Sequence, residues 1–286
     1  MISFEQKILL RFEGDEADHG VLDFYDAAQA LIGFQRSLAL TTHFVLNGTV
    51  ITQAPALKGA QISVQPPSMG SWLIVASIIG GVGYLGSRPK DTPLGHLVYS
   101  VYDYVLMRTM GIHIDYDKSI RQLVEERVQE DTKHISEGRL DDLSEKCENA
   151  IKEMHRPIVN SGTAEAAGFS TVSGSKIVPL KSMLTEETFE ALDFERRSVS
   201  TKIFEGMVSS YNMNTRTGRL YVKELARTIP FKIADSYLSR SVSTKIARNM
   251  TKLADGETHT PIVFEAFENQ SRNGRLRSIL VVRIRS

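Results

Sequence analysis

The glycines at positions 81, 83 and 86 form one of two short patterns that could bind a cofactor or take part in catalysis. Gly81-Val-Gly83-Tyr-Leu-Gly86 matches the glycine pattern of dinucleotide-binding loops, in which the glycines open a helix whose N-terminus holds phosphate. Here the pattern lies inside an apolar segment, and Pro89 and Pro93 follow it too closely for a helix to continue. We therefore do not predict a nucleotide site at these glycines.

The second pattern, His113-Ile-Asp115-Tyr-Asp117, places a histidine and two carboxylates on alternate residues. On a strand these side chains would share one face, and imidazole and carboxylate groups are common metal ligands. The sequence names no further ligand, and a loop in which Asp117 caps the next helix explains the same residues more simply. The chain shows no nucleophile elbow, Walker loop, Cys-x-x-Cys pair or zincin helix. We therefore expect a non-enzymatic protein without catalytic residues, metal or cofactor.

The charged residues are divided unevenly along the chain, although the net charge is zero. Residues 196–286 hold 17 Lys and Arg against 7 Asp and Glu, an excess of ten positive charges. Residues 1–195 hold the other 17 Lys and Arg against 27 Asp and Glu, an excess of ten negative charges. Such a split indicates separate roles for the two parts. Either the basic part binds a polyanion such as nucleic acid, or it docks onto an acidic part of the same chain or of a neighbour.

The nucleic-acid interpretation needs cations spaced along a phosphate backbone and aromatic rings that stack on bases. Cations surround two predicted turns of the basic part, whereas aromatic candidates are few, because Phe231 and Phe264 are expected to fill the core. The candidate nucleic-acid-binding residues are Tyr211, Arg216, Arg219, Tyr221, Lys223, Arg227, Lys232, Arg272, Arg275, Arg277 and Arg283.

Five strands and one helix are predicted to position these residues. The strands cover 201–209, 220–225, 228–233, 261–267 and 276–285. Asp235 is expected to cap the helix, whose apolar stripe is Leu238, Val242, Ile246, Met250 and Leu253. On the last strand, Leu280, Val282 and Ile284 should share one face, and Val281, Arg283 and Arg285 the other. The order β-β-β-α-β-β is that of the OB fold, so residues 196–286 are predicted to form a basic, OB-like five-stranded β-barrel domain.

The preceding part is predicted to be an acidic α+β domain over residues 1–158, with a β-α-β-β unit followed by a helical middle. A linker and a short helix are expected over 159–195, because 160–175 is rich in Gly, Ser, Thr and Ala. The expected N-terminal elements are a strand at 7–12, a helix at 22–46, extended segments at 60–65 and 71–76, and helices near 97–111, 117–130, 140–154 and 185–192.

Residues 59–87 carry no charged side chain. The apolar run within them, 72–85, is shorter than the ~20 residues of a membrane-spanning helix and is interrupted by three glycines. This favours a buried strand that leads into a packed, glycine-rich helix. The alternative is a membrane-associated or oligomeric effector or scaffold, in which this segment inserts into lipid or packs between subunits.

The only cysteine, Cys147, lies on the apolar stripe of the helix predicted at 140–154, which indicates core packing. A single cysteine forms no internal disulfide and fits a reducing compartment. The N-terminus lacks the basic and apolar regions of a secretory signal. We therefore expect a cytoplasmic protein.

Three segments carry a resemblance to a known group of proteins: Leu22-Asp-Phe-Tyr-Asp-Ala-Ala-Gln-Ala-Leu31, Pro66-Pro-Ser-Met-Gly-Ser-Trp72 and Pro89-Lys-Asp-Thr92. The chain resembles a family of uncharacterised bacterial proteins in which an N-terminal α+β region precedes a five-stranded β-barrel. The resemblance implies this fold and a place among mobile-element or phage-defence genes, and it implies no activity. Taken with the charge layout, it leads us to expect a homo-oligomer that associates through its N-terminal domain and binds nucleic acid through its barrel.

Overall fold

A computed structural model describes the chain in two compact units, Met1–Leu192 and Asp193–Ser286. The described residues are 4–65, 72–80, 93–112, 120, 135–225, 227–237, 239–256, 260–271, 274 and 276–285. The glycine pattern at 81–86 and the His113-Asp115-Asp117 pattern lie outside these residues, as does the helix predicted at 117–130 except for Ile120. The two units are considered one at a time below.

The N-terminal unit is built on a five-stranded sheet, which we call sheet A. Its strands are β1 (Phe4–Glu13), β2 (Ala60–Gln65), β3 (Trp72–Gly80), β4 (Ala166–Ser173) and β5 (Lys176–Leu184). They lie in the order β2-β3-β1-β4-β5, and every neighbouring pair is antiparallel. Strand β1 is central because it pairs with β3 along one edge and with β4 along the other. Phe4, Ile8, Leu10 and Phe12 lie at alternate positions along it and are buried on one face.

Strands β4 and β5 occupy the segment in which we expected a linker, and that expectation is wrong for residues 166–184. Small residues made 160–175 look like a loop, but in β4 they alternate with Ala167, Phe169 and Thr171, all of which are buried. Pairing of β4 with β1 over Ile8–Glu13 supplies the hydrogen bonds that a loop would lack. The pairing partner is more than 150 residues away, so local composition does not reveal it.

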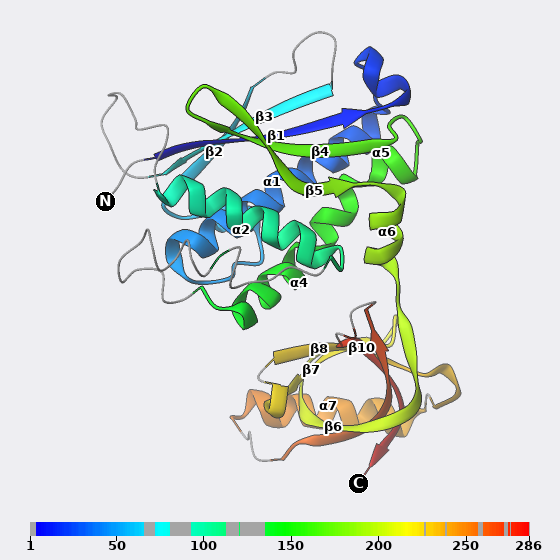
Figure 1. Ribbon diagram of the computed structural model, residues 1–286. Helices are drawn as coiled ribbons and strands as arrows, with labels where there is room; N and C mark the ends of the chain where they lie inside the picture. Colours follow the sequence, from blue (N-terminus) through cyan, green and yellow to red (C-terminus); the bar gives the residue numbers. More distant parts are fainter. Residues whose placement is uncertain are drawn as a thin grey trace. The chain divides into compact units, whose positions relative to one another are not determined.

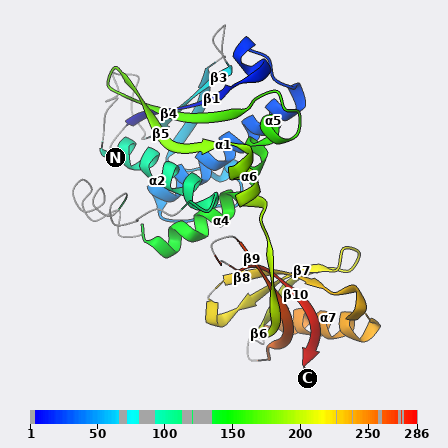
Figure 2. The ribbon, with the colours of Figure 1, turned by 45° about the vertical axis from the view of Figure 1, so that its right-hand side comes forward.

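Helices cover one face of sheet A, as Figures 1 and 2 show for α1, α2 and α4. The helices among its described residues are α1 (Phe24–Asn47), α2 (Pro93–Thr109), α4 (Glu137–Met154), α5 (Arg156–Val159) and α6 (Glu186–Asp193). Helix α1 begins where the Asp23 carboxylate accepts a hydrogen bond from the Asp26 amide, and it ends at Gly48 in the left-handed region. The predicted helices at 22–46 and 140–154 are thereby confirmed to within a few residues.

Helices α1 and α4 approach each other closely at Gly33. A Cβ atom added at Gly33 would lie 2.2 Å from the carbonyl oxygen of Ala150, so only glycine fits at this crossing. Near the other end of the contact, the Arg139 guanidinium lies over the Phe44 ring at 5.6 Å. The first contact joins the early part of α1 to the late part of α4, and the second joins the late part of α1 to the early part of α4. The two helices are therefore antiparallel.

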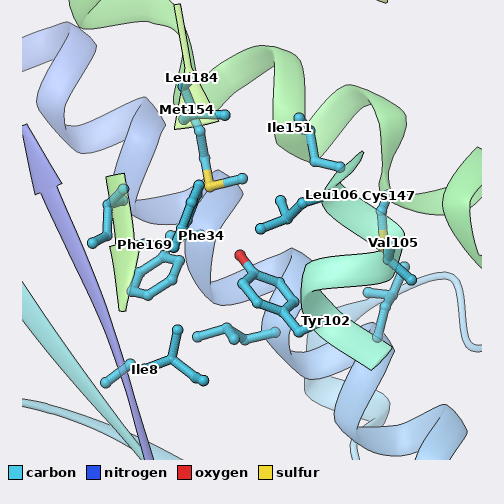
Figure 3. Packing of buried hydrophobic residues seen from close by; sticks show 14 of the residues in the cluster. Ile8, Phe34, Tyr102, Val105, Leu106, Cys147, Ile151, Met154, Phe169 and Leu184 are labelled. Carbon is cyan, nitrogen blue, oxygen red and sulfur yellow. The ribbon is translucent and has the colours of Figure 1, made fainter. Parts of the chain in front are cut away.

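Aromatic side chains fill the space between these helices and sheet A. Figure 3 shows Phe34 of α1, Tyr102 of α2 and Phe169 of β4 packed together, with ring centroids 5.9–6.5 Å apart. The buried Tyr102 hydroxyl satisfies its hydrogen bonding with the Ser37 hydroxyl at 3.0 Å. The helices and sheet A therefore share one hydrophobic core.

Cys147 lies in the same core, as the sequence predicted (Figure 3). It is fully buried, and burial raises the pKa of its thiol to about 12. The thiol is therefore protonated at neutral pH and acts as a small apolar side chain.

The uncharged segment contributes two strands to sheet A. Strand β2 matches its predicted bounds, and β3 places Ile74, Ala76 and Ile78 in the core, as expected for a buried strand. The part of the segment beyond Gly80 lies outside the described residues. None of the helices in the described residues has the length and apolar content needed to cross a membrane.

The C-terminal unit contains five strands whose hydrogen bonds close into a ring. The elements are β6 (Arg196–Asn212), β7 (Thr217–Val222), β8 (Arg227–Ile233), α7 (Arg240–Ala254), β9 (Ile262–Gln270) and β10 (Leu276–Arg285). The ring order is β10-β8-β7-β6-β9, and β8 and β10 form the one parallel pair of this closed circuit. The predicted order β-β-β-α-β-β is confirmed, and the whole protein is of mixed α+β class.

Two details of the ring differ from the sequence prediction. Strand β7 begins at Thr217 and ends at Val222, three residues earlier than expected, because Arg216 completes a tight turn with φ of 60°. Ser239 caps α7 by accepting a hydrogen bond from the Val242 amide, so the expectation of an Asp235 cap is wrong. Asp235 instead begins a short 3-10 turn and forms an ion pair with Arg216.

Helix α7 lies beside the strands of the ring (Figure 2) and closes its core. Val242 and Ile246 pack with Phe231 and Phe264, which are buried as predicted. Asn249 on the same side of α7 accepts a hydrogen bond from the Val208 amide and donates one to the Thr260 carbonyl. It thereby ties α7 to β6 at an irregularity in the pairing of that strand with β7.

Candidate functional site

The cations of the C-terminal unit fall into groups with different electrostatic surroundings. Basic side chains of β6 and β10 face two carboxylates of β9, the strand between them. Lys202 lies 2.8 Å from Glu268, and Arg285 and Arg283 lie 3.1 and 4.0 Å from Glu265. Hydrogen bonding from Arg285 lowers the pKa of Glu265, so this carboxylate is charged at neutral pH. Arg283, one of the predicted site residues, is therefore already paired within its own unit.

The outer face of β7 and β8 carries cations in different surroundings. Leu220, Val222, Ile229, Phe231 and Ile233 point into the core, so the alternate residues point outward. The exposed outward side chains Arg219, Tyr221 and Lys232, with Lys223 directly after β7, define what we call the β7–β8 surface.

The strand register sets the spacing on the β7–β8 surface. Arg219 pairs with Pro230, which makes Lys232 its diagonal neighbour across the two strands. Diagonal neighbours of this kind stand roughly 7–8 Å apart. Within the described residues, Arg219, Lys223 and Lys232 face no carboxylate at ion-pair distance. This surface therefore keeps its positive charge.

Arg216 lies at the β6–β7 hairpin, next to the β7–β8 surface. The Asn212 carboxamide oxygen accepts hydrogen bonds from the amides of Asn214 and Thr215 and holds the hairpin turn. The Arg216 guanidinium forms an ion pair with Asp235, which is itself 76% exposed in its side chain. An exposed pair of this kind contributes little to stability, so Arg216 can exchange Asp235 for another anion at low cost.

Tyr211 is not part of the exposed surface. Its ring stacks on Phe231 with centroids 6.0 Å apart and planes within 7°. The Phe231 ring in turn lies against Gly218, where a Cβ atom would be 2.5 Å from it. Its hydroxyl is buried and makes no hydrogen bond with a described residue. The ring therefore serves the core at one end of the strand circuit, and we leave it out of the surface discussed below. Tyr221, which is 43% exposed, is the aromatic residue of the prediction that faces outward.

The remaining predicted residues have other placements. Arg227 donates a hydrogen bond to the Leu276 carbonyl at 2.9 Å, which joins the start of β8 to β10. Arg277 is half-buried beside this contact. Arg272 and Arg275 lie outside the described residues. The structure thus brings together Arg219, Tyr221, Lys223 and Lys232, a smaller set than the sequence indicated.

The sequence-based set omitted one group of residues that the structure places together. Met213 of the β6–β7 hairpin and the outward side of α7 line an open groove of about 530 Å³. Its cations are Arg240, Arg248 and Lys252. Their spacing of eight and four residues on a helix was visible in the sequence, but the neighbouring hairpin residue was not.

Among the described residues, the buried histidines His43 and His155 are engaged in structural contacts. The His155 ring is fully buried, with Nδ1 2.8 Å from the Ile151 carbonyl and Nε2 3.0 Å from the Thr188 hydroxyl. His43 accepts a hydrogen bond from the Lys58 amide and contacts the Thr49 hydroxyl. Across the described parts of the chain, no three His, Cys, Asp or Glu side chains gather as a metal-binding group would.

Fold and surface together define a class of protein: a layered α+β unit followed by a basic unit of five strands in a ring. Residues 8–193 match the family model described as "Domain of unknown function (DUF7946)", and the chain belongs to this family. Residues 200–285 match a second model, described as "Family of unknown function (DUF7947)". The two matches follow the two structural units closely. No curated protein and no solved structure matches the chain.

Proposed function

We propose that the C-terminal unit is an OB-like domain that binds the backbone of nucleic acid through the β7–β8 surface. Five strands in a ring, with a helix between the third and fourth strands, support the OB-like assignment. OB domains bind oligonucleotides on the face of their second and third strands. In this unit those strands are β7 and β8, and they carry Arg219 and Lys232, which have no carboxylate partner among the described residues.

The observation that carries the proposal is the contrast between the two cationic faces. Arg283 and Arg285 share the carboxylate of Glu265 on one face. Arg219 and Lys232 have no described carboxylate partner on the other. A polyanion would bind most strongly where the protein's own acidic residues do not neutralise the positive charge. Phosphates are such a ligand, and Tyr221 beside them offers an exposed ring on which a base can stack.

Binding of this kind has a defined dependence on salt. Each phosphate contact to a single strand contributes about 0.7 to the slope of log affinity against log salt. Contacts from Arg219, Lys223 and Lys232 would give a slope of about 2, so affinity falls roughly 20-fold when salt is raised fourfold. Fluorescence anisotropy with a labelled oligothymidine at two salt concentrations measures this slope.

A pair of double variants tests the position of the site. Arg219→Gln with Lys232→Gln should weaken binding and lower the salt slope by about 1.4. Arg283→Gln with Arg285→Gln removes the same net charge from the compensated face and should change binding little. Equal losses in both double variants would show that overall charge, and not the β7–β8 surface, governs binding. Absence of binding by the unchanged protein at low salt would end the proposal.

The N-terminal unit is proposed to mediate self-association through one face of α1. Phe24, Tyr25 and Ile32 are exposed on that face, and Phe24 is 88% exposed. Val21, just before the helix, is exposed as well. A two-fold axis across this stripe would pair it with the same stripe of a second copy, which needs no other partner. Light scattering of the whole chain should give a dimer mass that Phe24→Ser with Ile32→Ser reduces to that of a monomer. A monomer mass for the unchanged chain rules the dimer out.

A further inference from the structure

The groove along α7 extends the cationic area beyond the β7–β8 surface. Its lining consists of Met213, Arg240, Ser243, Thr244, Ala247, Arg248, Thr251 and Lys252. Apart from Met213, these residues recur every three or four positions and form one side of α7, opposite its buried residues Val242, Ile246 and Asn249. The groove is therefore a feature of the solvent side of α7 and of the hairpin beside it.

The rim of the groove is positively charged. Arg248 follows Arg240 by two helical turns and precedes Lys252 by one, so the three cations stand roughly 12 and 6 Å apart along the axis. None of the three pairs with a carboxylate among the residues that the structure describes. Successive phosphates of one strand could therefore meet successive cations of this rim.

The floor of the groove is apolar. The Thr244 hydroxyl donates to the Arg240 carbonyl at 2.9 Å, and the Thr251 hydroxyl donates to the Ala247 carbonyl at 3.1 Å. The hydroxyl protons of both threonines are therefore used within the helix, and Ala247 adds an apolar side chain to the lining. Met213 adds an exposed thioether at its edge, and thioethers make favourable contacts with aromatic rings.

The hairpin joins this groove to the β7–β8 surface. Met213 lines the groove, while Arg216 of the same turn bonds through its carbonyl to the Ile233 amide at the end of β8. Lys232 of the β7–β8 surface immediately precedes that residue. One extended ligand could therefore run from β7 and β8 across the hairpin and into the groove.

We infer that the groove holds an unpaired nucleotide of a single strand whose backbone crosses the β7–β8 surface. This inference rests on the proposed function and adds a preference for strand state. A base unstacked from its neighbours would lie on the floor formed by Ala247 and Met213, with its phosphates at the cationic rim. In a duplex the bases are stacked inside the helix, so a duplex reaches the rim with phosphates and leaves the floor empty.

The decisive variant fills the floor and leaves every charge in place. Ala247 is exposed, so Ala247→Leu occupies the groove without disturbing the core. Ser241→Leu is the matched control, because Ser241 is an exposed residue of the same helix outside the groove. Anisotropy is measured with a labelled oligothymidine and with a duplex of equal length, and circular dichroism confirms that both variants are folded.

The expected result is selective. Ala247→Leu should weaken single-strand binding at least about fivefold, the effect of losing one stacked base, and should leave duplex binding unchanged. Ser241→Leu should change neither single-strand nor duplex binding. Equal weakening of both ligands by Ala247→Leu, or no weakening of either, overturns the inference. Polyglutamate that competes as well as oligothymidine at equal charge also overturns it, because the groove would then accept an acidic protein segment.

These outcomes separate the inference from the proposed function. If Arg219→Gln with Lys232→Gln weakens binding while Ala247→Leu does not, the nucleic acid binds on the β7–β8 surface and does not use the groove. If Ala247→Leu weakens binding and the double variant does not, the groove binds the strand and the β7–β8 surface is not part of the site. If the unchanged protein binds neither oligothymidine nor duplex at low salt, both fail together.

Discussion

The buried histidine of the N-terminal unit should make the stability of that unit depend on pH. His155 directly follows α4, and neither of its ring nitrogens reaches solvent. Burial lowers the pKa of His155 to about 4, although the hydrogen bond to the Ile151 carbonyl acts in the opposite direction. In the unfolded chain the same ring has its ordinary pKa of 6.5.

The sign and size of the effect follow from these two values. Below pH 6.5 the unfolded chain takes up a proton that the folded chain does not, so acid favours unfolding. The stabilising contribution of the neutral ring is complete above pH 6.5 and is lost as pH falls toward about 4. Between about pH 7.5 and pH 5, this one group should lower the free energy of unfolding by about 2 kcal/mol.

Urea unfolding at the two pH values measures the effect. Trp72, the single tryptophan, lies in β3 against Phe12, so its fluorescence reports on the N-terminal unit. His155→Gln keeps a hydrogen-bonding side chain that does not titrate in this range, and it should reduce the difference between the two pH values by about 2 kcal/mol. Equal pH dependence in the variant and the unchanged protein would refute the assignment to His155.

Three further predictions follow from packing and burial. Gly33→Ala should lower the free energy of unfolding by roughly 1–3 kcal/mol despite the better helix propensity of alanine, because its Cβ would meet the Ala150 carbonyl. Gly138→Ala is the control, since nothing lies within 4 Å of that position, and it should not lower the melting temperature. Asn249→Ala should lower the free energy of unfolding of the C-terminal unit by roughly 2–4 kcal/mol, because the Val208 amide and the Thr260 carbonyl lose their hydrogen bonds to the Asn249 carboxamide. A loss below about 0.5 kcal/mol would contradict the importance of these two bonds. Cys147 should react with a thiol reagent only at the rate of unfolding, and a fast reaction in the folded protein would contradict its burial and its pKa of about 12.

Regular periodicity allowed much of the fold to be predicted. The stripe through Leu140, Leu143 and Cys147 repeats at helical spacing, and α4 buries all three side chains. The order of strands in the C-terminal unit followed from alternation and turn residues. In both cases the signal lies within a few neighbouring residues, so it does not depend on where distant segments pack.

Irregular pairing explains where the prediction was wrong. On β10 we expected Leu280, Val282 and Ile284 to share a face, but a register shift between Val281 and Arg283 changes the alternation. Val281 is therefore buried together with Ile284, and Arg283 points outward. One extra residue in a strand reverses the orientation of those before it relative to those after it, and the sequence carries no mark of its position.

The sequence predicted that the candidate site would be cationic, but it did not predict which residues would form it. Composition showed an excess of cations near the C-terminal strands, and that excess is a property of the sequence alone. Which cations are compensated depends on pairs such as Lys202 with Glu268, which are 66 positions apart. The stacking of Tyr211 on Phe231 is of the same kind. Only the register of the strands decides such contacts.

The strand topology also bears on how the protein is made. Strand β1 lies between β3 and β4, so the middle of sheet A stays unpaired on one side until residue 173 has been synthesised. In the C-terminal unit, β8 and β9 are each paired along only one edge until β10 pairs with both of them. Each unit therefore exposes strand edges on the ribosome until its late strand emerges, and a chaperone that shields such edges would act at two separate points of translation.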